Sequence, residues 1–364
     1  MPTVTLTLPH HSYNIRIEPG GLTQLGSAMQ ATCPHGKAGL VVDANIETSH
    51  GRVAARSLET ANYDTVVAIM PIGEDHKTLG TMRSLYEVLL DAKLERRSPI
   101  VALGGGITGD TGGFVAATYL RGVPFVQCPT TLLAMVDASV GGKVGVNVPQ
   151  GKNLIGAFYQ PQLVMIDTDT LRTLPQRELR CGLAECVKHG MIRDPRLFEW
   201  TARHVESIEA LDSDTMVELV ERNVKIKAAV VMEDEKETGV RAHLNFGHTF
   251  AHALEAATDY GQYAHGEAVA LGMVAATRLA VALGKCGGGA LDELTALLDR
   301  IGLPTSARNL PPGDILLARM RMDKKVADAK IRFVLPSRIG SVFIADDVDD
   351  EAVLDSWEAV RRPR

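Results

Sequence analysis

The chain has 364 residues, of which 45% are hydrophobic and 23% are charged, and its formal net charge at pH 7 is −6. This length suits two domains with well-developed cores, and the acidic balance argues against nucleic acid or an anionic membrane as a partner. Five cysteines without a CxxC pair, and an N-terminus without an apolar signal core, predict a soluble cytoplasmic protein with free thiols.

The first half of the chain predicts a parallel β-sheet with crossover helices. The N-terminal segment up to Ile17 alternates like a strand, and Thr78–Leu94 has apolar residues at helical spacing. Short runs rich in β-branched residues are expected to be strands at Gly39–Asp43, Thr65–Met70, Ile100–Gly105, Phe125–Pro129 and Leu163–Asp167. Because these runs hardly alternate, both faces of the sheet are expected to be covered. We therefore predict a Rossmann-like α/β nucleotide-binding domain over residues 1–174.

The second half is predicted to be mostly α-helical. Helices are expected at Leu179–Ile192, Leu197–Leu211, Asp214–Glu235, Thr249–Ala257, Glu267–Leu283 and Gly289–Ile301. The most apolar stretch, Ala268–Leu283, contains Arg278 and is too short for a membrane span, so it is expected to be a buried helix. We predict a helical domain over residues 175–364, with the functional site in a cleft between the two domains.

A glycine-rich turn follows the expected strand at Ile100. The run SPIVALGGGITGDTGGF (Ser98–Phe114) places three glycines, Gly104, Gly105 and Gly106, between a strand and the start of a helix. It matches neither GxGxxG nor the GxxxxGK[ST] phosphate loop, but main-chain N–H groups at such a position can bind a pyrophosphate. The alternative is a tight turn without a ligand. Asp43, at a strand end, could bind a ribose hydroxyl or could cap a helix.

Basic residues lie in or beside the glycine-rich turns and helix starts. They are Arg121, Lys143, Lys152, Lys188, Lys225, Lys227, Arg241, Lys324 and Lys325. In an acidic protein this placement favours an anionic small molecule as ligand, although any single lysine can simply be a solvated surface group. Lys143 and Lys152 are the stronger candidates, because the segment around them is otherwise small, apolar and rich in turns.

Four residues are candidate metal ligands, whereas a catalytic metal takes about three protein ligands and keeps an open position. They are Glu185, His248, His252 and His265. His248 and His252 are four residues apart and would share one helix face. Thr249 replaces the glutamate of an HExxH motif, which argues against a zinc protease. A histidine of this kind can also be a hydrogen-bonded core residue.

At these residues the chain resembles the 3-dehydroquinate synthase family. The resemblance extends from VVD (Val41–Asp43) to DKK (Asp323–Lys325), nearly the whole chain. In order, its blocks are PIGEDHK, GGGITGD, YLRGVPFVQCPTTLLAMVDASVGGKVGVN, GKNLIGAFYQP, TLPQRE, GLAECVKHG, RAHLNFGHTFAHALE and HGEAVALGM. Taken in this order, these blocks are highly specific for that family.

The resemblance implies a role for each matching residue. It implies zinc, or cobalt, bound by Glu185, His248 and His265. It implies NAD bound by Asp43, Glu74, Lys77, Gly104, Gly105, Gly106, Asp110, Thr130, Thr131, Lys143, Lys152, Thr173 and Glu178. It implies that the substrate contacts Asp137, Lys143, Lys152, Asn153, Lys188, Lys227, Arg241, Asn245, His252 and a lysine of the pair Lys324 and Lys325. In this family Arg121 reaches the neighbouring subunit's site, which implies a homodimer.

The implied reaction converts 3-deoxy-D-arabino-heptulosonate 7-phosphate into 3-dehydroquinate and phosphate. NAD oxidises the substrate transiently, phosphate leaves by β-elimination, and reduction and an intramolecular aldol closure follow. The chain departs from the family pattern at His189, Ala251, Ala264 and Ala329, none of which is an implied ligand. The alternatives are another sugar-phosphate cyclase, a metal-dependent polyol dehydrogenase or a non-catalytic sensor. Arg241 and Lys227 favour a substrate that carries a carboxylate.

Overall fold

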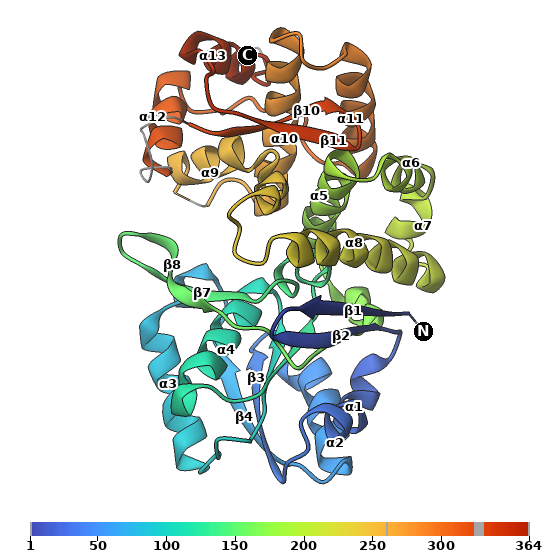
Figure 1. Ribbon diagram of the computed structural model, residues 1–364, viewed down its shortest axis with the longest axis vertical. Coiled ribbons are helices and arrows are strands. Elements are labelled where there is room, and N and C mark those ends of the chain that lie inside the picture. Colours follow the sequence, from blue (N-terminus) through green and yellow to red (C-terminus); the bar gives the residue numbers. More distant parts are fainter. Residues whose placement is uncertain (1, 260, 324–330, 363–364) are drawn as a thin grey trace. The chain divides into compact units, whose positions relative to one another are not determined.

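The computed structural model describes residues 2–259, 261–323 and 331–362 and divides into two compact units (Figure 1). The first unit contains Met1–Pro175 and Leu211–Lys236, and the second contains Gln176–Ala210 and Glu237–Arg364. The segment Leu211–Lys236, which the sequence analysis places in the second domain, thus groups with the first unit. The chain passes between the units at residues 175/176, 210/211 and 236/237.

A seven-stranded sheet forms the centre of the first unit. In spatial order its strands are β1 (Thr3–Leu8), β2 (His11–Ile17), β9 (Leu163–Ile166), β6 (Phe125–Pro129), β5 (Ile100–Gly104), β3 (Lys37–Asp43) and β4 (Asp64–Met70). β1 and β2 form an antiparallel hairpin, and every other neighbouring pair is parallel. This order confirms the Rossmann-like α/β fold and each of the strands expected after Ile17.

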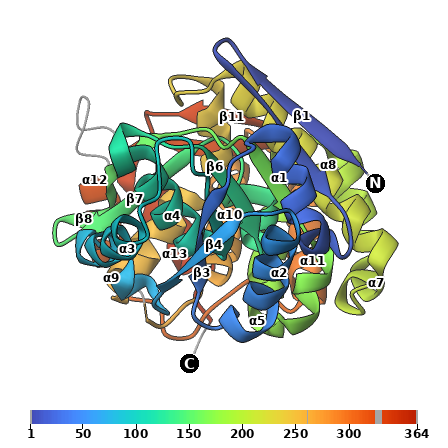
Figure 2. The ribbon, with the colours of Figure 1, turned by 90° about the horizontal axis from the view of Figure 1, so that it is seen from below.

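Helices cover both faces of this sheet, because successive strand residues point to opposite sides. Leu40 and Val42 of β3 pack with α1 (Leu25–Thr32) and α2 (Arg52–Thr60). Val41, between them, packs with α3 (Leu79–Asp91) and α4 (Gly106–Thr118) on the other face. Figure 2 shows β3 and β4 between these two pairs of helices. Burial on both faces explains why the strand sequences are apolar without alternation.

A second hairpin, one long helix and several short helical segments complete the first unit. β7 (Lys143–Val148) and β8 (Gly151–Phe158) form an antiparallel hairpin in a segment that the sequence analysis interprets as turn-rich. The long helix α8 (Ser213–Glu233) packs against β1, where the main-chain N–H of Thr7 lies 3.4 Å from Sδ of Met232. Short helical segments are η1 (Gly21–Gln24), η2 (Glu47–Gly51), η3 (Glu74–His76), η4 (Tyr119–Arg121), η5 (Ala134–Ala138) and η6 (Thr168–Thr173).

The second unit is mostly helical, as predicted. Its elements are α5 (Gln176–Ile192), α6 (Pro195–Arg203), α7 (Val205–Glu209), η7 (Val240–Asn245), α9 (His248–Ala257), α10 (His265–Ala282), α11 (Gly288–Ile301), α12 (Gly313–Asp323), β10 (Phe333–Arg338), β11 (Ser341–Ala345) and α13 (Asp350–Glu358). α10 is buried along almost its whole length and contacts α5, α9, α11 and α13 (Figure 1). The predicted helix Leu197–Leu211 is divided into α6 and α7, because His204 leaves helical geometry (φ −113°, ψ 15°).

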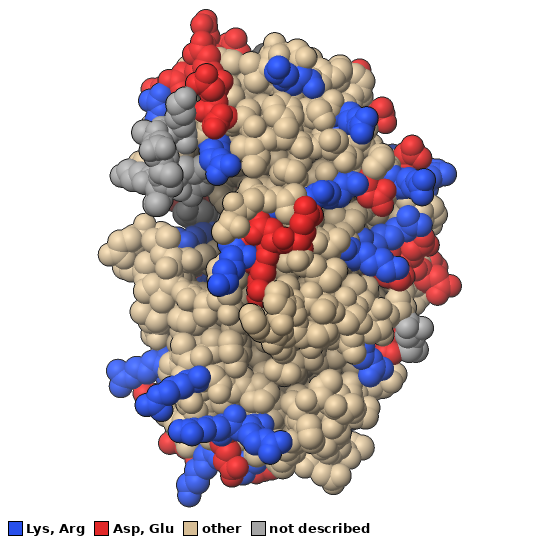
Figure 3. Space-filling model, viewed as in Figure 1, with Lys and Arg blue, Asp and Glu red and all other residues tan. Residues whose placement is uncertain are grey.

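Three surface and core features bear on the sequence-based expectations. No described helix is both long enough and apolar enough to cross a membrane. All five cysteines are free thiols, and only Cys286 is not buried. On the face drawn in Figure 3, basic and acidic side chains of the described residues are interspersed among uncharged ones.

Candidate metal and cofactor sites

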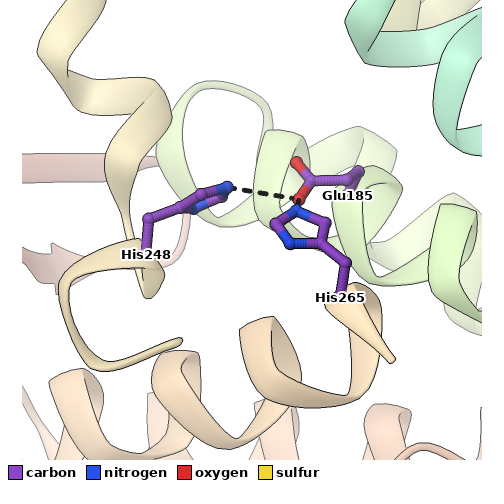
Figure 4. Close-up of side chains that lie close together, drawn as sticks. All are labelled: Glu185, His248 and His265. Atoms are coloured by element: carbon purple, nitrogen blue, oxygen red, sulfur yellow. Dashed lines mark ion pairs between the residues drawn. The ribbon is translucent and has the colours of Figure 1, made fainter. Parts of the chain in front are cut away.

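A buried carboxylate and two histidines meet in the second unit. Glu185 lies in the middle of α5, and His248 and His265 are the first residues of α9 and α10. Oε1 of Glu185 lies 3.5 Å from Nε2 of His248 and 3.6 Å from Nε2 of His265 (Figure 4). The structure therefore gathers these three candidate ligands, with one ligand atom from each lying within 4.8 Å of the others.

Glycines beside the histidines allow the three helices to approach one another. Gly247 precedes α9 with φ +79°, and a Cβ there would lie 2.9 Å from the main-chain N of Met273 in α10. A Cβ on Gly266, the second residue of α10, would lie 2.3 Å from Cα of Cys181 in α5. Only glycine, which has no Cβ, fits at these two contacts. The sequences FGH and HGE thus place a histidine next to a close helix–helix contact.

Hydrogen bonds on the far side of each ring fix which nitrogen faces Glu185. Nδ1 of His248 lies 3.1 Å from the main-chain oxygen of Phe246, and Nδ1 of His265 lies 3.2 Å from Oε1 of Glu255. A carbonyl or an ionised carboxylate only accepts, so each Nδ1 donates. A neutral imidazole that donates from Nδ1 has a free lone pair on Nε2. Both rings therefore present a potential ligand atom to the same place.

The electrostatics of the group follow from burial and from a neighbouring lysine. Burial opposes charge on Glu185, but the Lys188 ammonium, followed by the two histidines, holds its pKa well below the usual range. Burial and then Lys188 lower the pKa of His248 to about 3. Burial also opposes charge on His265, but the neighbouring carboxylates of Glu185 and Glu255 raise its pKa to about 10. A metal bound here would displace the proton from His265.

This donor set fits a divalent metal with an open coordination position. Two imidazole nitrogens and a carboxylate are ligands that zinc and cobalt share. Oε1 of Glu185 accepts no hydrogen bond from the described residues, although it is fully buried. His252, the fourth candidate, is outside the group, and its ring is edge-on to His248 with 5.5 Å between centroids.

The other predicted residues of the second unit differ in their surroundings. Lys188 is buried and makes an ion pair with Glu185, three residues earlier on α5. Arg241 is also buried, in η7. Nδ2 of Asn245 donates to Oε1 of Glu237 at 3.0 Å. Glu178 is exposed in the first turn of α5, and Lys324 and Lys325 lie outside the described residues.

In the first unit, the glycine-rich turn joins β5 to α4. Gly104 ends the strand, Gly105 is the N-cap and Gly106 begins the helix. A Cβ on Gly104 would lie 2.7 Å from Oγ1 of Thr108, and one on Gly105 would lie 3.2 Å from Cγ2 of Thr131. The first N–H groups of a helix have no partner within it and favour negative charge. The turn thus brings the N-terminus of α4 to the carboxyl end of β5, a position that favours an anion.

A buried lysine connects three segments, one of which is the helix α4 that follows this turn. Nζ of Lys77 donates to Oδ2 of Asp110 at 2.6 Å and to Oδ1 of Asn153 at 2.5 Å. Burial raises the pKa of Asp110, and Lys77 opposes that shift. Beside this cluster, Oε1 of Glu74 accepts from Nδ2 of Asn147 at 2.7 Å and lies 3.8 Å from Nζ of Lys152. Five predicted ligands thus belong to one polar network.

Other predicted cofactor residues lie where parallel strands end. Asp43 ends β3, and its carboxylate accepts from the main-chain N–H of Asn45 at 2.9 Å within a turn. The helical segment that follows, η2, has Ile46 as its N-cap, so Asp43 does not cap that segment. Thr130 follows β6, and its main-chain N–H donates to the Gly104 oxygen at 2.9 Å. The carboxyl ends of parallel strands form the usual binding edge of such a sheet. Thr173, at the end of η6, lies 2.8 Å from Nε2 of His50.

The remaining predicted residues of the first unit lie on η4, η5, β7 and α8. Nζ of Lys227 donates to the main-chain oxygen of Asp137 at 2.6 Å and makes an ion pair with its carboxylate. Lys143 is exposed at the start of β7. Arg121 is exposed and has φ +70°, directly after Leu120 with φ +47°.

Three residues that contact the candidate ligands were not predicted from the sequence. They are Glu255, which contacts His265, Asn147, which contacts Glu74, and His50, which contacts Thr173. Glu255 could have been noticed, because His248, His252 and Glu255 are spaced four and then three residues apart on one helix. No sequence pattern points to Asn147 or His50, because their partners are 73 and 123 residues away in the chain.

Comparisons with known proteins agree over nearly the whole chain. Residues 67–181 match the family model described as 3-dehydroquinate synthase N-terminal, and residues 182–326 match the one described as 3-dehydroquinate synthase C-terminal. A 3-dehydroquinate synthase of Microcystis aeruginosa is 48% identical over 95% of this chain and 94% of its own. One of Desulforamulus reducens is 46% identical over 97% of this chain and 99% of its own.

Solved structures with a similar fold include two synthases and a dehydrogenase. A 2-epi-5-epi-valiolone synthase from Streptomyces hygroscopicus, with NAD+ and Zn2+ bound, has a TM-score of 0.89 at 26% identity and covers 97% of this chain and 98% of its own. A 2-deoxy-scyllo-inosose synthase, complexed with carbaglucose-6-phosphate, NAD+ and Co2+, has a TM-score of 0.90 at 26% identity, with coverage of 99% and 100%. A glycerol dehydrogenase from Schizosaccharomyces pombe shares only the fold, with a TM-score of 0.67 at 16% identity.

Proposed function

The chain belongs to the 3-dehydroquinate synthase family, and from this premise we propose that it converts 3-deoxy-D-arabino-heptulosonate 7-phosphate into 3-dehydroquinate and phosphate. It is a carbon–oxygen lyase of the shikimate pathway, and its cofactors are NAD and a divalent metal, zinc or cobalt. The observation that carries the proposal is the convergence of Nε2 of His248 and His265 on the buried carboxylate of Glu185. A curated relative at 48% identity favours this substrate over those of the cyclases at 26%.

NAD, when bound, supplies a temporary hydride acceptor, and the metal supplies a Lewis acid. We propose that Glu185, His248 and His265 hold the metal. The ion pair of Glu185 with Lys188 supports this, because it keeps the carboxylate ionised in a buried place.

For the cofactor, we propose that the Gly104–Gly106 turn binds the pyrophosphate and that Asp43 binds a ribose hydroxyl. The position of the turn at the N-terminus of α4 supports the first assignment. The further proposed NAD contacts are Glu74, Lys77, Asp110, Thr130, Thr131, Lys143, Lys152, Thr173 and Glu178. In the first unit, Lys77 orders this region by bonding to both Asp110 and Asn153.

The substrate carries a phosphate and a carboxylate, so its proposed contacts are mainly cationic or hydrogen-bonding groups. They are Asp137, Lys143, Lys152, Asn153, Lys188, Lys227, Arg241, Asn245 and His252, with a lysine of the pair Lys324 and Lys325. Lys227 holds Asp137 in place through its carbonyl oxygen and its carboxylate. Arg241 offers a planar fork of donors that suits a carboxylate.

Phosphate release from 3-deoxy-D-arabino-heptulosonate 7-phosphate tests the proposed reaction. We expect release that chelation abolishes and zinc restores, without net change in nicotinamide absorbance, because the hydride returns to the product. Net NADH formed from a polyol would instead indicate a dehydrogenase. Release from glucose 6-phosphate or sedoheptulose 7-phosphate alone would indicate another cyclase.

His265→Ala tests the metal assignment with little disturbance of the fold, since His265 is partly exposed at a helix start, whereas Glu185 is in a buried ion pair. We expect His265→Ala to lose both zinc and turnover while its circular dichroism stays that of the wild type. Glu199→Gln, which removes an exposed carboxylate paired with Arg203, is the matched control and should keep both. Zinc retained at one equivalent in His265→Ala would contradict the assignment.

We propose further that the protein is a cytoplasmic homodimer in which Arg121 of one copy serves the other. Two observations support this proposal. Arg121 is exposed and, like Leu120, has a positive φ, a conformation that non-glycine residues adopt at a cost of about 1–3 kcal/mol and that often marks functional positions. The free thiols suit a reducing compartment. Light scattering should give twice the chain mass of 39.1 kDa.

A further inference from the structure

Glu255 is a carboxylate in an unfavourable place. It lies in the last turn of α9, where the helix dipole disfavours negative charge, and it is 7% exposed. A buried carboxylate needs a charged or hydrogen-bonding partner to offset its lost hydration. Its position therefore calls for a specific interaction rather than a general role in the core.

That interaction is with His265. Oε1 of Glu255 lies 3.2 Å from Nδ1 of His265, on the side of the ring opposite the nitrogen that faces Glu185. His248, His252 and Glu255 lie along one face of α9, so one helix carries a candidate ligand and also reaches the ring of another. Glu255 thereby connects α9 to the first residue of α10.

The two candidate histidine ligands are oriented in different ways. His248 donates to a main-chain oxygen, that of Phe246 two residues earlier, which no substitution removes. His265 donates to the side chain of Glu255. Without that acceptor, the ring of His265 could adopt the other tautomer or rotate, and its Nε2 lone pair would no longer be fixed on the metal position.

We propose that Glu255 is a positioning residue that fixes the tautomer and direction of His265 and thereby sets the metal affinity of the group. The inference rests on the proposed metal site and extends it to a residue that does not itself bind the metal. Partners of this kind typically change metal affinity 10- to 100-fold when they are removed. The amide oxygen of glutamine can accept the same hydrogen bond, so Glu255→Gln should preserve most of the effect.

The test measures zinc affinity by competition with a chelator of known affinity. We expect Glu255→Ala to weaken zinc binding about 10- to 100-fold and Glu255→Gln to weaken it by less than about 10-fold. Excess zinc should restore turnover in Glu255→Ala but not in His265→Ala. The visible spectrum of the cobalt-substituted protein should change in Glu255→Ala, because the direction of one ligand has changed.

Glu206→Gln is the matched control, since Glu206 is in the same unit and its carboxylate pairs with Arg300 at 2.7 Å. It should bind zinc like the wild type. Zinc affinity of Glu255→Ala within twofold of the wild type would overturn the inference, as would equal losses in the alanine and glutamine variants. If Glu255→Ala does not fold, Glu255→Asp decides: its shorter side chain must weaken zinc binding several-fold. Failure of the wild type to bind zinc would instead overturn the proposed metal site itself.

Discussion

His50 joins η2 to the end of η6 through one hydrogen bond. Its Nε2 lies 2.8 Å from Oγ1 of Thr173, and the ring is partly buried. Burial lowers the pKa of His50, and the smaller effect of Asp167 raises it. The folded protein therefore keeps this ring neutral to a lower pH than the unfolded chain does.

This shift predicts how stability depends on pH. The unfolded chain binds a proton at His50 near pH 6.5, whereas the folded protein resists it, so stability is lost as the pH falls through that value. His50→Gln should remove this contribution and flatten the stability profile between pH 7 and pH 5. Urea unfolding midpoints across that range measure it, with the exposed His10→Gln as control. Parallel profiles for the wild type and His50→Gln would contradict the prediction.

Individual site residues were predictable where a local motif identifies their chemistry. Glu185, His248 and His265 could be found because histidines and a carboxylate recur in glycine-flanked helix segments. Which three of the four candidates gather could not be read from spacing, since His252 shares a helix face with His248 yet lies outside the group. Contacts such as Lys77 with Asp110 and Asn153 join residues 33 and 76 positions apart, and no local pattern records them.

The helix α4 packs directly against the sheet through its glycines. A Cβ on Gly112 would lie 2.8 Å from Cβ of Ala102 in β5, and one on Gly109 would lie 2.4 Å from Nε2 of Gln127 in β6. The Ala102 contact is the less forgiving, because a Cβ moves only with its backbone. The glycines that follow the Gly104–Gly106 turn therefore set the distance between helix and sheet.

Gly112→Ala should destabilise the protein by about 1–3 kcal/mol, because the added methyl group overpacks this contact. The matched control is Gly80→Ala in α3, where the new Cβ would meet only Oγ1 of Thr78, at 3.5 Å. That change should stabilise by roughly 0.5–1 kcal/mol, since alanine favours a helix over glycine. Thermal unfolding of both variants gives the comparison. A Gly112→Ala variant as stable as Gly80→Ala would show that α4 can shift without strain.

Elements were predictable where burial imposes a pattern on the sequence. The parallel strands are apolar throughout because helices cover both faces. The hairpin β7–β8 was missed because β8 is largely exposed, with Leu154, Ile155 and Phe158 all on its surface, so polar and apolar residues do not alternate. The break at His204 was missed because the apolar spacing continues across it from α6 into α7.

The sequence could not predict that α8 belongs to the first unit. Its periodicity predicts a helix, but the identity of its partners depends on β1 and η5, which are far away in the chain. A fragment of residues 1–175 lacks this helix, which leaves part of β1 uncovered and removes Lys227 from Asp137. We expect that fragment to lack cooperative unfolding and to bind a hydrophobic dye.

Joining residues 211–236 to that fragment through a flexible linker should restore a cooperative urea transition and near-ultraviolet circular dichroism. The same linker followed by a shuffled 211–236 sequence is the control for added length and composition. If the fragment without α8 unfolds as cooperatively as the fragment joined to residues 211–236, this helix is not required for the core of the first unit.

Because the chain returns to the first unit at Leu211, the order of synthesis constrains how the protein can fold during translation. A ribosome adds roughly 5–20 residues per second, so residues 176–236 take roughly 3–12 s to make after Pro175 has been added. During that interval the strands of the sheet have been synthesised but α8 has not. The helix α5, with Glu185, is synthesised before α9 and α10. The synthesis of neither unit can be completed before synthesis of the other has begun. Translation therefore cannot produce the two units one after the other.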